Sequence, residues 1–167
     1  MTRSFYLEKM QEKDFDAFLI LTGNEQVMAL ITGRPLTREE ALAKFTSLLE
    51  NNGLHKSLGS FLVRDASEFI VLGFAKLEIT PENQASAEIG FMLMPDFWGK
   101  GYGREIAARL MRVAESVPEL SRVWANIDPG NMASRRILEG LGFVSEYMGE
   151  IDGLPSEILG KNLKFNE

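Results

Sequence analysis

The 167-residue sequence predicts a mixed α/β fold, and three features of the chain carry this prediction. Apolar stretches of strand length alternate with stretches whose apolar residues recur at helical spacing. Between residues 87 and 127, a strand, a glycine-rich turn, a helix and a second strand follow one another, which implies a parallel strand pair with a right-handed crossover. Hairpin signals on both sides of this unit imply antiparallel neighbours.

The N-terminal part of the chain is predicted to be helical after one short strand. That strand covers residues 5–7, and apolar residues at helical spacing follow at 15–19 and 27–30. The segment Thr37–Glu40 has the spacing of a capping box, the signature of a helix N-terminus. The helix that starts there is expected to end at the Asn52-Gly53 pair.

A hairpin and a third strand are predicted next. Residues 60–64 and 69–79 are apolar and β-branched, and the turn-forming segment 65–67 separates them. A third strand is expected at 87–94, ending at Pro95.

The remaining elements follow the glycine-rich turn. A helix is predicted directly after the glycines from the helical spacing of Ile106, Leu110, Val113 and Val117, and it ends near Pro118. We then expect a strand at 122–127, a turn at 128–130, and a helix at 131–141 that Gly142 terminates. A closing strand pair, 143–148 and 156–165, is joined through the turn signal Asp152-Gly153.

Length and composition are those of an ordinary globular protein, with 45% hydrophobic and 25% charged residues. We expect one domain spanning residues 1–167. No apolar run approaches the roughly 20 residues that a membrane span needs, so no membrane partner is expected. Residues 1–10 lack the apolar stretch of a secretory signal, and we therefore expect a cytoplasmic protein.

The residue types present also exclude several kinds of chemistry. Without cysteine there is no disulfide, no thiolate nucleophile and no Cys-based metal site. The single histidine, His55, cannot build a multi-histidine site, so no metal is expected. The net charge of −6 argues against binding to nucleic acid, which needs clustered basic residues. This charge fits a cationic substrate, and it equally fits a small domain that must remain soluble.

The glycine-rich turn is the stretch most suggestive of chemistry. Gly99, Gly101 and Gly103 remove side chains at the start of a helix, where unpaired N–H groups and the helix dipole favour an anion such as a pyrophosphate. Lys100 and Arg104 could add charged contacts to phosphate oxygens. A P-loop and a Rossmann fingerprint both fit these residues worse. A tight strand-to-helix turn that simply needs small residues remains the alternative.

These residues resemble the GNAT N-acetyltransferases, particularly the branch of ribosomal-protein N-terminal acetyltransferases. Glu88–Phe91 and Phe97–Gly103 are similar to the coenzyme A motif of that branch. Asn131–Leu138 followed by Leu141–Phe143 is similar to its second motif, at the expected separation. The resemblance covers most of the chain. Where the general family pattern has Gln or Arg, this chain has Trp98, which the resembling branch often carries.

The resemblance implies a fold and a co-substrate, acetyl-CoA. The expected fold is a mixed sheet of about six or seven strands with helices on both faces. Its strand ending near Met94 and the strand 122–127 would splay into a slot for pantetheine. A backbone N–H in this region would also hold the developing oxyanion.

The resemblance further assigns cofactor contacts to three segments. Backbone groups would bind the pantetheine arm at Phe91, Met92, Leu93 and Met94. The turn would hold the diphosphate through Trp98, Gly99, Lys100, Gly101, Tyr102, Gly103 and Arg104. On the second helix, Asn131, Ser134 and Arg135 lie at i, i+3 and i+4, hence on one face, which should look at the cofactor.

Proton transfer needs further residues. An alkyl amine with a pKa of about 10 is mostly protonated at pH 7 and attacks only when neutral, so a base or a proton path is required. Glu88 is the candidate base, as in some family members, with a structural strand carboxylate as the alternative. Many GNAT enzymes have a Tyr acid at the position of Leu138. Ser134 is the candidate acid here, or only a hydrogen-bonding contact to coenzyme A, and Tyr147 is a further candidate.

The predicted activity is transfer of acetyl from acetyl-CoA directly to a primary amine, on a small molecule or a protein N-terminus. The regions 23–35 and 149–156 are expected to select the acceptor. The alternative function is a non-catalytic acyl-CoA-binding module, which Leu138 in place of the acid suggests. A homodimer is common in the family, and the sequence leaves the oligomeric state open.

Overall fold

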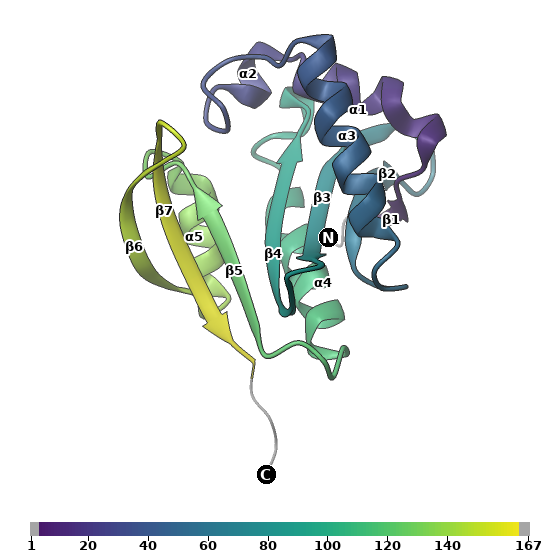
Figure 1. Ribbon diagram of the computed structural model, residues 1–167. Helices are drawn as coiled ribbons and strands as arrows, with labels where there is room; N and C mark the ends of the chain where they lie inside the picture. The colour runs from purple at the N-terminus through teal and green to yellow at the C-terminus, as the bar shows by residue number, and fades with distance from the viewer. Residues whose placement is uncertain (1–3, 164–167) are drawn as a thin grey trace.

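Within the described residues 4–163 of this computed structural model, seven strands form one mixed sheet in the order β1-β2-β3-β4-β5-β7-β6 (Figure 1). The strands are β1 (Phe5–Lys9), β2 (Gly59–Asp65), β3 (Val71–Thr80), β4 (Asn83–Leu93), β5 (Arg122–Ile127), β6 (Val144–Ile151) and β7 (Leu154–Asn162). The α-helices are α1 (Phe15–Thr22), α2 (Glu25–Met28), α3 (Arg38–Asn52), α4 (Tyr102–Glu115) and α5 (Met132–Gly140). Short 3-10 helices occupy Glu12–Asp14 and Pro95–Phe97.

The sheet is antiparallel except at its centre, where β4 and β5 run parallel. In the part of the chain that the structure describes, this parallel pairing is short, joining Ser86, Ala87 and Glu88 to Arg122, Val123 and Trp124. Beyond these positions β4 continues to Leu93 while β5 stays paired with β7, and the two central strands diverge (Figure 1). The predicted mixed sheet with a splayed parallel pair is confirmed.

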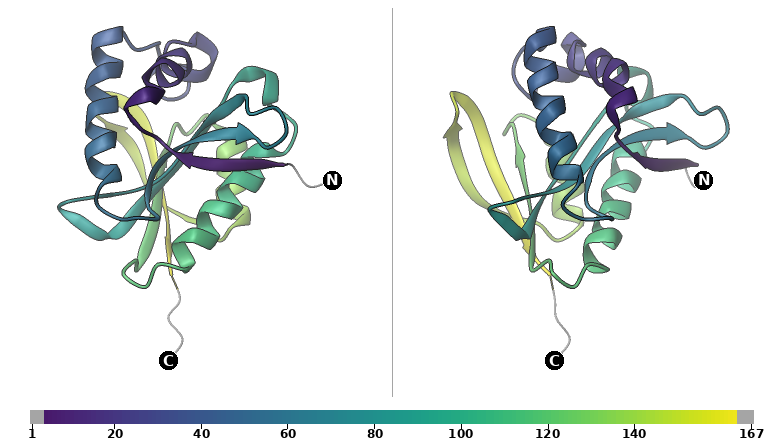
Figure 2. Two further views of the ribbon diagram at one scale, coloured as in Figure 1. Left: turned by 90° about the vertical axis from the view of Figure 1, so that its right-hand side faces the viewer. Right: turned by 45° about the vertical axis from the view of Figure 1, so that its right-hand side comes forward.

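Helices cover both faces of the sheet, as predicted (Figure 2). The larger core cluster includes Ile106 of α4 and Leu138 of α5, both almost completely buried. A second cluster lies on the other face and contains Phe18 of α1, Phe45 of α3 and Phe74 of β3. Because successive residues of a strand point to opposite faces, the sheet contributes side chains to both clusters.

Some element boundaries differ from those predicted. The strand expected from Phe69 begins at Val71, because Phe69 has a φ of 61° and donates its N–H to the Asp65 carbonyl in the turn. β4 begins at Asn83 rather than Ala87, since a hairpin pairs its polar first residues with β3. The predicted end of the last strand, Phe165, lies outside the described residues.

Hydrogen bonds at the N-terminus of α3 fix the loop that precedes this helix. The predicted capping box is present, with Thr37 Oγ1 accepting from the Glu40 N–H at 3.2 Å and a Glu40 carboxylate oxygen accepting from the Thr37 N–H at 2.9 Å. Arg34 donates two further hydrogen bonds, of 2.8 and 2.7 Å, to the same carboxylate. The Arg34 bonds first, and the Thr37 N–H next, lower the pKa of Glu40 to about 2.

Among residues 4–163, no helix is both long and apolar enough to cross a membrane.

Removing the α3 cap tests its contribution to stability. We expect Thr37→Ala to lower the free energy of unfolding by about 1 kcal/mol, because it leaves the Glu40 N–H without its side-chain acceptor. Urea denaturation followed by circular dichroism measures this change. The matched control is Ser47→Ala, an exposed position within the same helix, which should change stability by less than about 0.5 kcal/mol. Equal effects of the two substitutions would contradict the capping role.

Candidate active site

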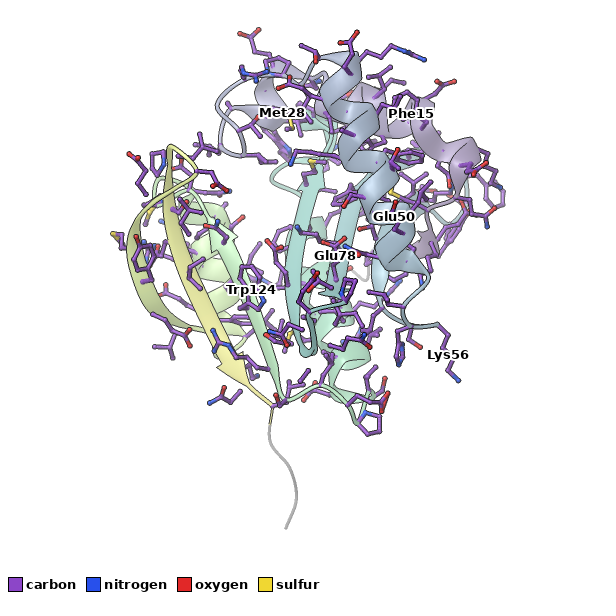
Figure 3. The ribbon with its side chains drawn as sticks, viewed as in Figure 1. Phe15, Met28, Glu50, Lys56, Glu78 and Trp124 are labelled. Carbon is purple, nitrogen blue, oxygen red and sulfur yellow. The ribbon has the colours of Figure 1, made fainter. Side chains whose placement is uncertain are left out.

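A pocket of about 390 Å³ lies where β4 and β5 diverge. It is lined by residues of β3, β4 and β5, by the N-terminal turn of α5, by the α1–α2 region, and by the β6–β7 hairpin. The last β5 residue that pairs with β4, Trp124, is labelled in Figure 3, and Met28 of α2 lies at the opposite, open end of the divergence. The pocket therefore joins segments from both ends of the chain at the centre of the sheet.

The divergence leaves the main chain of β4 open toward β5. Successive residues of a strand direct their N–H and C=O groups to opposite sides. The Met94 N–H donates to the Leu72 carbonyl of β3 at 2.9 Å. By this alternation, the main-chain N–H and C=O groups of Leu93 and Phe91 point away from β3 and toward β5. The Leu93 carbonyl accepts a 2.8 Å bond from the indole Nε1 of Trp98. Phe91, which lines the pocket, therefore presents main-chain groups to it.

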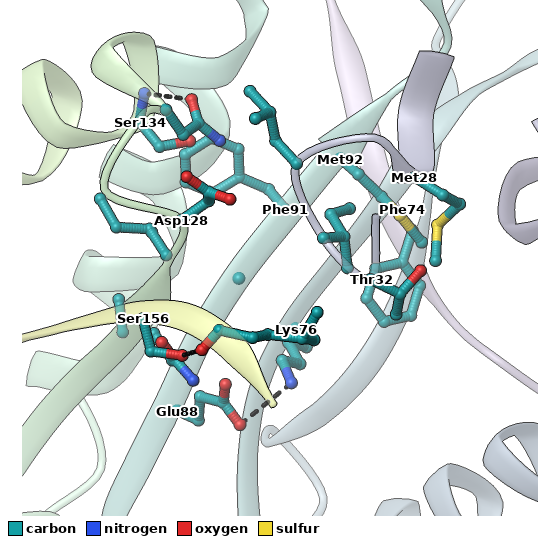
Figure 4. A pocket seen from close by; sticks show the side chains of 18 of the residues that line it. Met28, Thr32, Phe74, Lys76, Glu88, Phe91, Met92, Asp128, Ser134 and Ser156 are labelled. Carbon is teal, nitrogen blue, oxygen red and sulfur yellow. Dashed lines mark hydrogen bonds and ion pairs between the residues drawn. The ribbon is translucent and has the colours of Figure 1, made fainter. Parts of the chain in front are cut away.

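Glu88 lines the pocket beside Lys76 of β3. The Lys76 ammonium lies 3.0 Å from the Glu88 carboxylate, and both side chains are about one quarter exposed (Figure 4). Lys76 is paired across the strands with Gly90, where an added Cβ would lie 3.0 Å from the Lys76 Cε. The absence of a side chain at Gly90 therefore lets Lys76 lie diagonally across β4 to reach Glu88.

A second carboxylate stands directly opposite Glu88. Glu78 of β3 is its cross-strand partner, and like charges at such positions repel. Asn51 of α3 donates to the Glu78 carboxylate at 3.3 Å, while Lys76 pairs with Glu88. The two carboxylates are thus held by different partners.

The sequence did not predict Lys76 as a site residue, because only the strand register shows that the Lys76 side chain lies on the same face as Glu88.

The glycine-rich turn leads directly into α4. Gly99 and Gly101 have φ angles of 73° and 87°, which other residues adopt only with strain, and Gly101 is the N-cap of α4. Gly103 is required for a different reason. A Cβ there would lie 3.2 Å from the Ile137 side chain and 3.4 Å from the Phe91 ring. The third glycine thus permits β4, α4 and α5 to pack together next to the pocket.

The other residues of the turn surround these glycines. Lys100 places its ammonium 6.0 Å from the centre of the Phe97 ring, and Tyr102 packs edge-on against the same ring. Arg104 is exposed in the first turn of α4. The turn residues 98–104 do not line the pocket. The turn lies next to the pocket because Gly103 packs against the ring of Phe91, which does line it.

The start of α5 brings two of the predicted residues into the pocket. Asn131 caps the helix by accepting a 3.1 Å bond from the Ser134 N–H. Asn131, Ser134 and the buried Leu138 are spaced at i, i+3 and i+7, and all three line the pocket. Figure 4 shows Ser134 there. Tyr147, the further acid candidate, is 48% exposed on the edge strand β6 and lies outside the pocket lining.

Arg135 is oriented by a protein partner. Its guanidinium makes a two-bond ion pair with Glu157 of β7, one bond being 2.9 Å long, and Glu157 is completely buried. The pair joins α5 to β7, and the residues that precede its two members in the chain, Ser134 and Ser156, line the pocket. A cofactor contact by Arg135 stays a prediction, and any such contact must share the guanidinium with Glu157.

The two regions expected to select the acceptor both reach the pocket. From the first region, the residues that line the pocket are Met28 and Leu30–Thr32. From the second region, they are Ile151, Asp152 and Leu154–Ser156. Asp128 also lines the pocket, although the sequence predicted only a turn there. No local signal distinguishes a turn aspartate from a pocket aspartate.

A parallel pair that splays over a pocket, followed by a glycine turn that opens a helix, is the architecture that the sequence predicted for an acetyltransferase. The chain matches the family model for the acetyltransferase (GNAT) domain over residues 4–144, and it therefore belongs to the GNAT acetyltransferase family.

One curated relative is the FsC-acetyl coenzyme A-N(2)-transacetylase of Aspergillus fumigatus, 30% identical over 80% of this chain and 60% of the relative. The chain thus spans less than two thirds of that protein.

Two solved structures share the fold. A spermidine N-acetyltransferase from Vibrio cholerae, bound to CoA and spermine, has a TM-score of 0.76 and 19% identity, covering 95% of each chain. A ribosomal-protein alpha-N-acetyltransferase, RimL, bound to coenzyme A, has a TM-score of 0.77 and 16% identity, covering 97% of this chain and 96% of that chain. At these identities the likeness concerns the fold alone.

The buried ion pair can be tested by single and double substitution. Arg135→Met should lower the free energy of unfolding by about 3 kcal/mol, because it leaves Glu157 buried without its partner. Arg135→Met combined with Glu157→Met should recover most of this loss, since apolar side chains of similar size often replace a buried ion pair without cost.

Denaturation in urea measures both variants, with Arg136→Met as the control because Arg136 is exposed on the same helix. A double variant as unstable as the single one would show that the loss comes from Met at position 135 rather than from an unpaired carboxylate.

Proposed function

We propose that the chain is an acetyl-CoA-dependent N-acetyltransferase that transfers acetyl directly to a primary amine, and that residues 1–167 form a single acetyltransferase domain. The family membership supports acetyl transfer, and the pocket at the strand divergence supports a site where two substrates meet. The single observation that carries the proposal is the convergence of Glu88, Phe91 and Ser134 on that pocket.

The residues present fit acetyl-CoA as the acetyl donor. Gly99 has open space around its backbone, and the first N–H groups of α4 lack intrahelical acceptors, so the turn suits a diphosphate. Lys100 and Arg104 would add charge. The main chain of Phe91 to Met94 would bind the pantetheine arm in the divergence. The Phe91 N–H is the proposed donor to the oxyanion, because it is directed into the pocket.

Glu88 is the proposed proton acceptor. The attacking nitrogen must lose a proton before or during attack, and the Glu88 carboxylate lies in the same pocket, where it could accept that proton directly or through a water. Lys76 fixes the position of this carboxylate from the neighbouring strand.

Ser134 is the proposed contact to the departing sulfur. Its helix cap places the residue at the pocket wall, where the hydroxyl could donate a proton or a hydrogen bond. A thiol with a pKa of about 8.5 leaves without strong assistance, so the two roles differ mainly in the size of their effect on rate.

The role of Glu88 is tested by Glu88→Gln, which keeps size and removes basicity. We expect kcat to fall at least about tenfold, with little change in acetyl-CoA affinity. Thiol release with a panel of amines measures the rate, and calorimetry measures the affinity. The control is Glu82→Gln, an exposed carboxylate in the β3–β4 turn, which should leave both unchanged. An unchanged rate in Glu88→Gln would falsify the base assignment.

The turn is tested by adding one methyl group to Gly101. Gly101→Ala places a side chain on a residue with a φ of 87°, which costs about 1–2 kcal/mol, so we expect acetyl-CoA affinity to fall about tenfold as the turn shifts. Gly140→Ala is the matched control, because Gly140 ends α5 with open space around it and without a positive φ.

Calorimetry on both variants gives the comparison. Equal affinities for Gly101→Ala and the unmodified protein would remove the turn from the binding site. Binding of acetyl-CoA without turnover of any amine would instead favour a non-catalytic acyl-CoA-binding module.

A further inference from the structure

One wall of the pocket is built from large apolar side chains. Phe18 of α1, Met28 of α2 and Phe74 of β3 line the pocket and belong to the second core cluster, against which the pocket-lining Met92 of β4 packs. Figure 4 shows Met28, Phe74 and Met92 gathered on the side of the pocket away from Asp128 and Ser134. We call this group, Phe18, Met28, Phe74 and Met92, the apolar wall.

The loop after α2 extends this wall with exposed aliphatic side chains. Leu30 and Ile31 line the pocket and are each 44% exposed, so a ligand in the pocket could cover apolar surface that solvent now contacts. The loop is held in place rather than free. The N–H groups of Ile31, Thr32 and Gly33 all donate to the Met28 carbonyl, and Arg34 is paired with Glu40.

The charged groups of the pocket suit one ammonium rather than several. Among the described residues that line it, the carboxylates are Glu88, Asp128 and Asp152 and the cations are Lys44 and Lys76. Lys76 already neutralises Glu88, and the Asp128 carboxylate accepts a 2.7 Å bond from the Gly130 N–H. The apolar wall contains no carboxylate, so a second ammonium placed against it would lack a counter-charge.

The Glu88 carboxylate and the apolar wall lie at opposite ends of one face of β4. Glu88 and Met92 point to the same face of β4, because side chains alternate with a period of two. Four residues separate them, about 13 Å along the strand. An acceptor whose amine lies on the carboxylate side and whose body points toward the wall thus has a polar group at one end and an apolar group at the other.

From these observations we infer that the acceptor is a primary amine with a single ammonium and an extended apolar body, which packs against the apolar wall and the Leu30–Ile31 loop. This inference rests on the proposed function and narrows its acceptor class. The same chemistry occurs in a free alkyl or aralkyl amine and in a peptide whose first residue has a large apolar side chain. It excludes polyamines and peptides that begin with small residues as preferred acceptors.

A matched series of amines tests the inference on the unmodified protein. Thiol release is measured with propylamine, hexylamine, cadaverine and spermidine at saturating acetyl-CoA. The value of kcat/KM should rise on the order of threefold for each methylene from propylamine to hexylamine, as buried methylenes do. Cadaverine, which has an ammonium where hexylamine has its terminal methyl, should be at least about tenfold poorer than hexylamine.

Two peptides distinguish the source of the acceptor. Tripeptides that begin with leucine or with glycine are compared with hexylamine under the same conditions. The leucine peptide should exceed the glycine peptide in kcat/KM. A leucine peptide better than hexylamine identifies a peptide N-terminus as the source, and the reverse order identifies a free amine.

A loop variant tests the surface directly. The double substitution Leu30→Ser with Ile31→Ser should lower kcat/KM for hexylamine about tenfold while leaving that for propylamine within about twofold. Ile20→Ser is the control, because Ile20 is 63% exposed on α1 outside the pocket lining. Thermal denaturation verifies that both variants are folded, as expected for partly exposed positions.

The outcomes separate this inference from the function on which it rests. Turnover of cadaverine or spermidine equal to or better than that of hexylamine overturns the apolar acceptor and leaves acetyl transfer standing. A loop variant that affects propylamine and hexylamine equally also overturns it. Absence of thiol release with every amine and peptide, while acetyl-CoA still binds, overturns the proposed function and this inference together.

Discussion

The parting of β4 from β5 after Glu88 and Trp124 is the constraint on which the rest of the structure depends. A sheet that parts at its centre loses ladder bonds, and unpaired main-chain groups are costly to bury. The protein places these groups at a pocket rather than in the core. One of them, the Leu93 carbonyl, is satisfied by the indole of Trp98, and the Phe91 groups face the space between the strands. The opening therefore costs little when a polar ligand can occupy it.

Contacts on one face of the sheet hold the divergence in shape. Gly103 allows the start of α4 to meet Phe91 and Ile137, so the glycine turn is fixed relative to β4 and α5. The Arg135–Glu157 pair ties α5 to β7, which is itself paired along the whole of β5. The strand that diverges from β4, β5, is thus connected to α5 through β7. The buried ion pair therefore holds together elements that line the pocket without lining it itself.

The other half of the pocket comes from segments far apart in the chain. The α1–α2 region and its loop lie over the β3–β4 side, and the β6–β7 hairpin lies over the β5 side. Neither segment takes part in the central parallel pairing, which joins β4 and β5. Under the proposed acetyl transfer, these two segments form the acceptor side of the pocket.

The sequence by itself determined the order and type of the elements, because periodicity, capping and turn chemistry are local properties. The capping box at Thr37, the hairpins, the parallel unit and the glycine turn all agreed with the structure, and motif resemblance indicated the family that the comparison then confirmed. Of the predicted site, Glu88, Phe91, Met92, Asn131 and Ser134 meet in one pocket.

Strand register and helix packing decided the rest. Lys76 faces Glu88 only through the β3–β4 register, and Arg135 meets Glu157 only because α5 packs on β7. Asp128 and the apolar wall enter the site only when the two halves of the sheet are brought together. Such contacts join residues that are distant along the chain, so no local pattern encodes them, and only the tertiary structure shows which side chains share a surface.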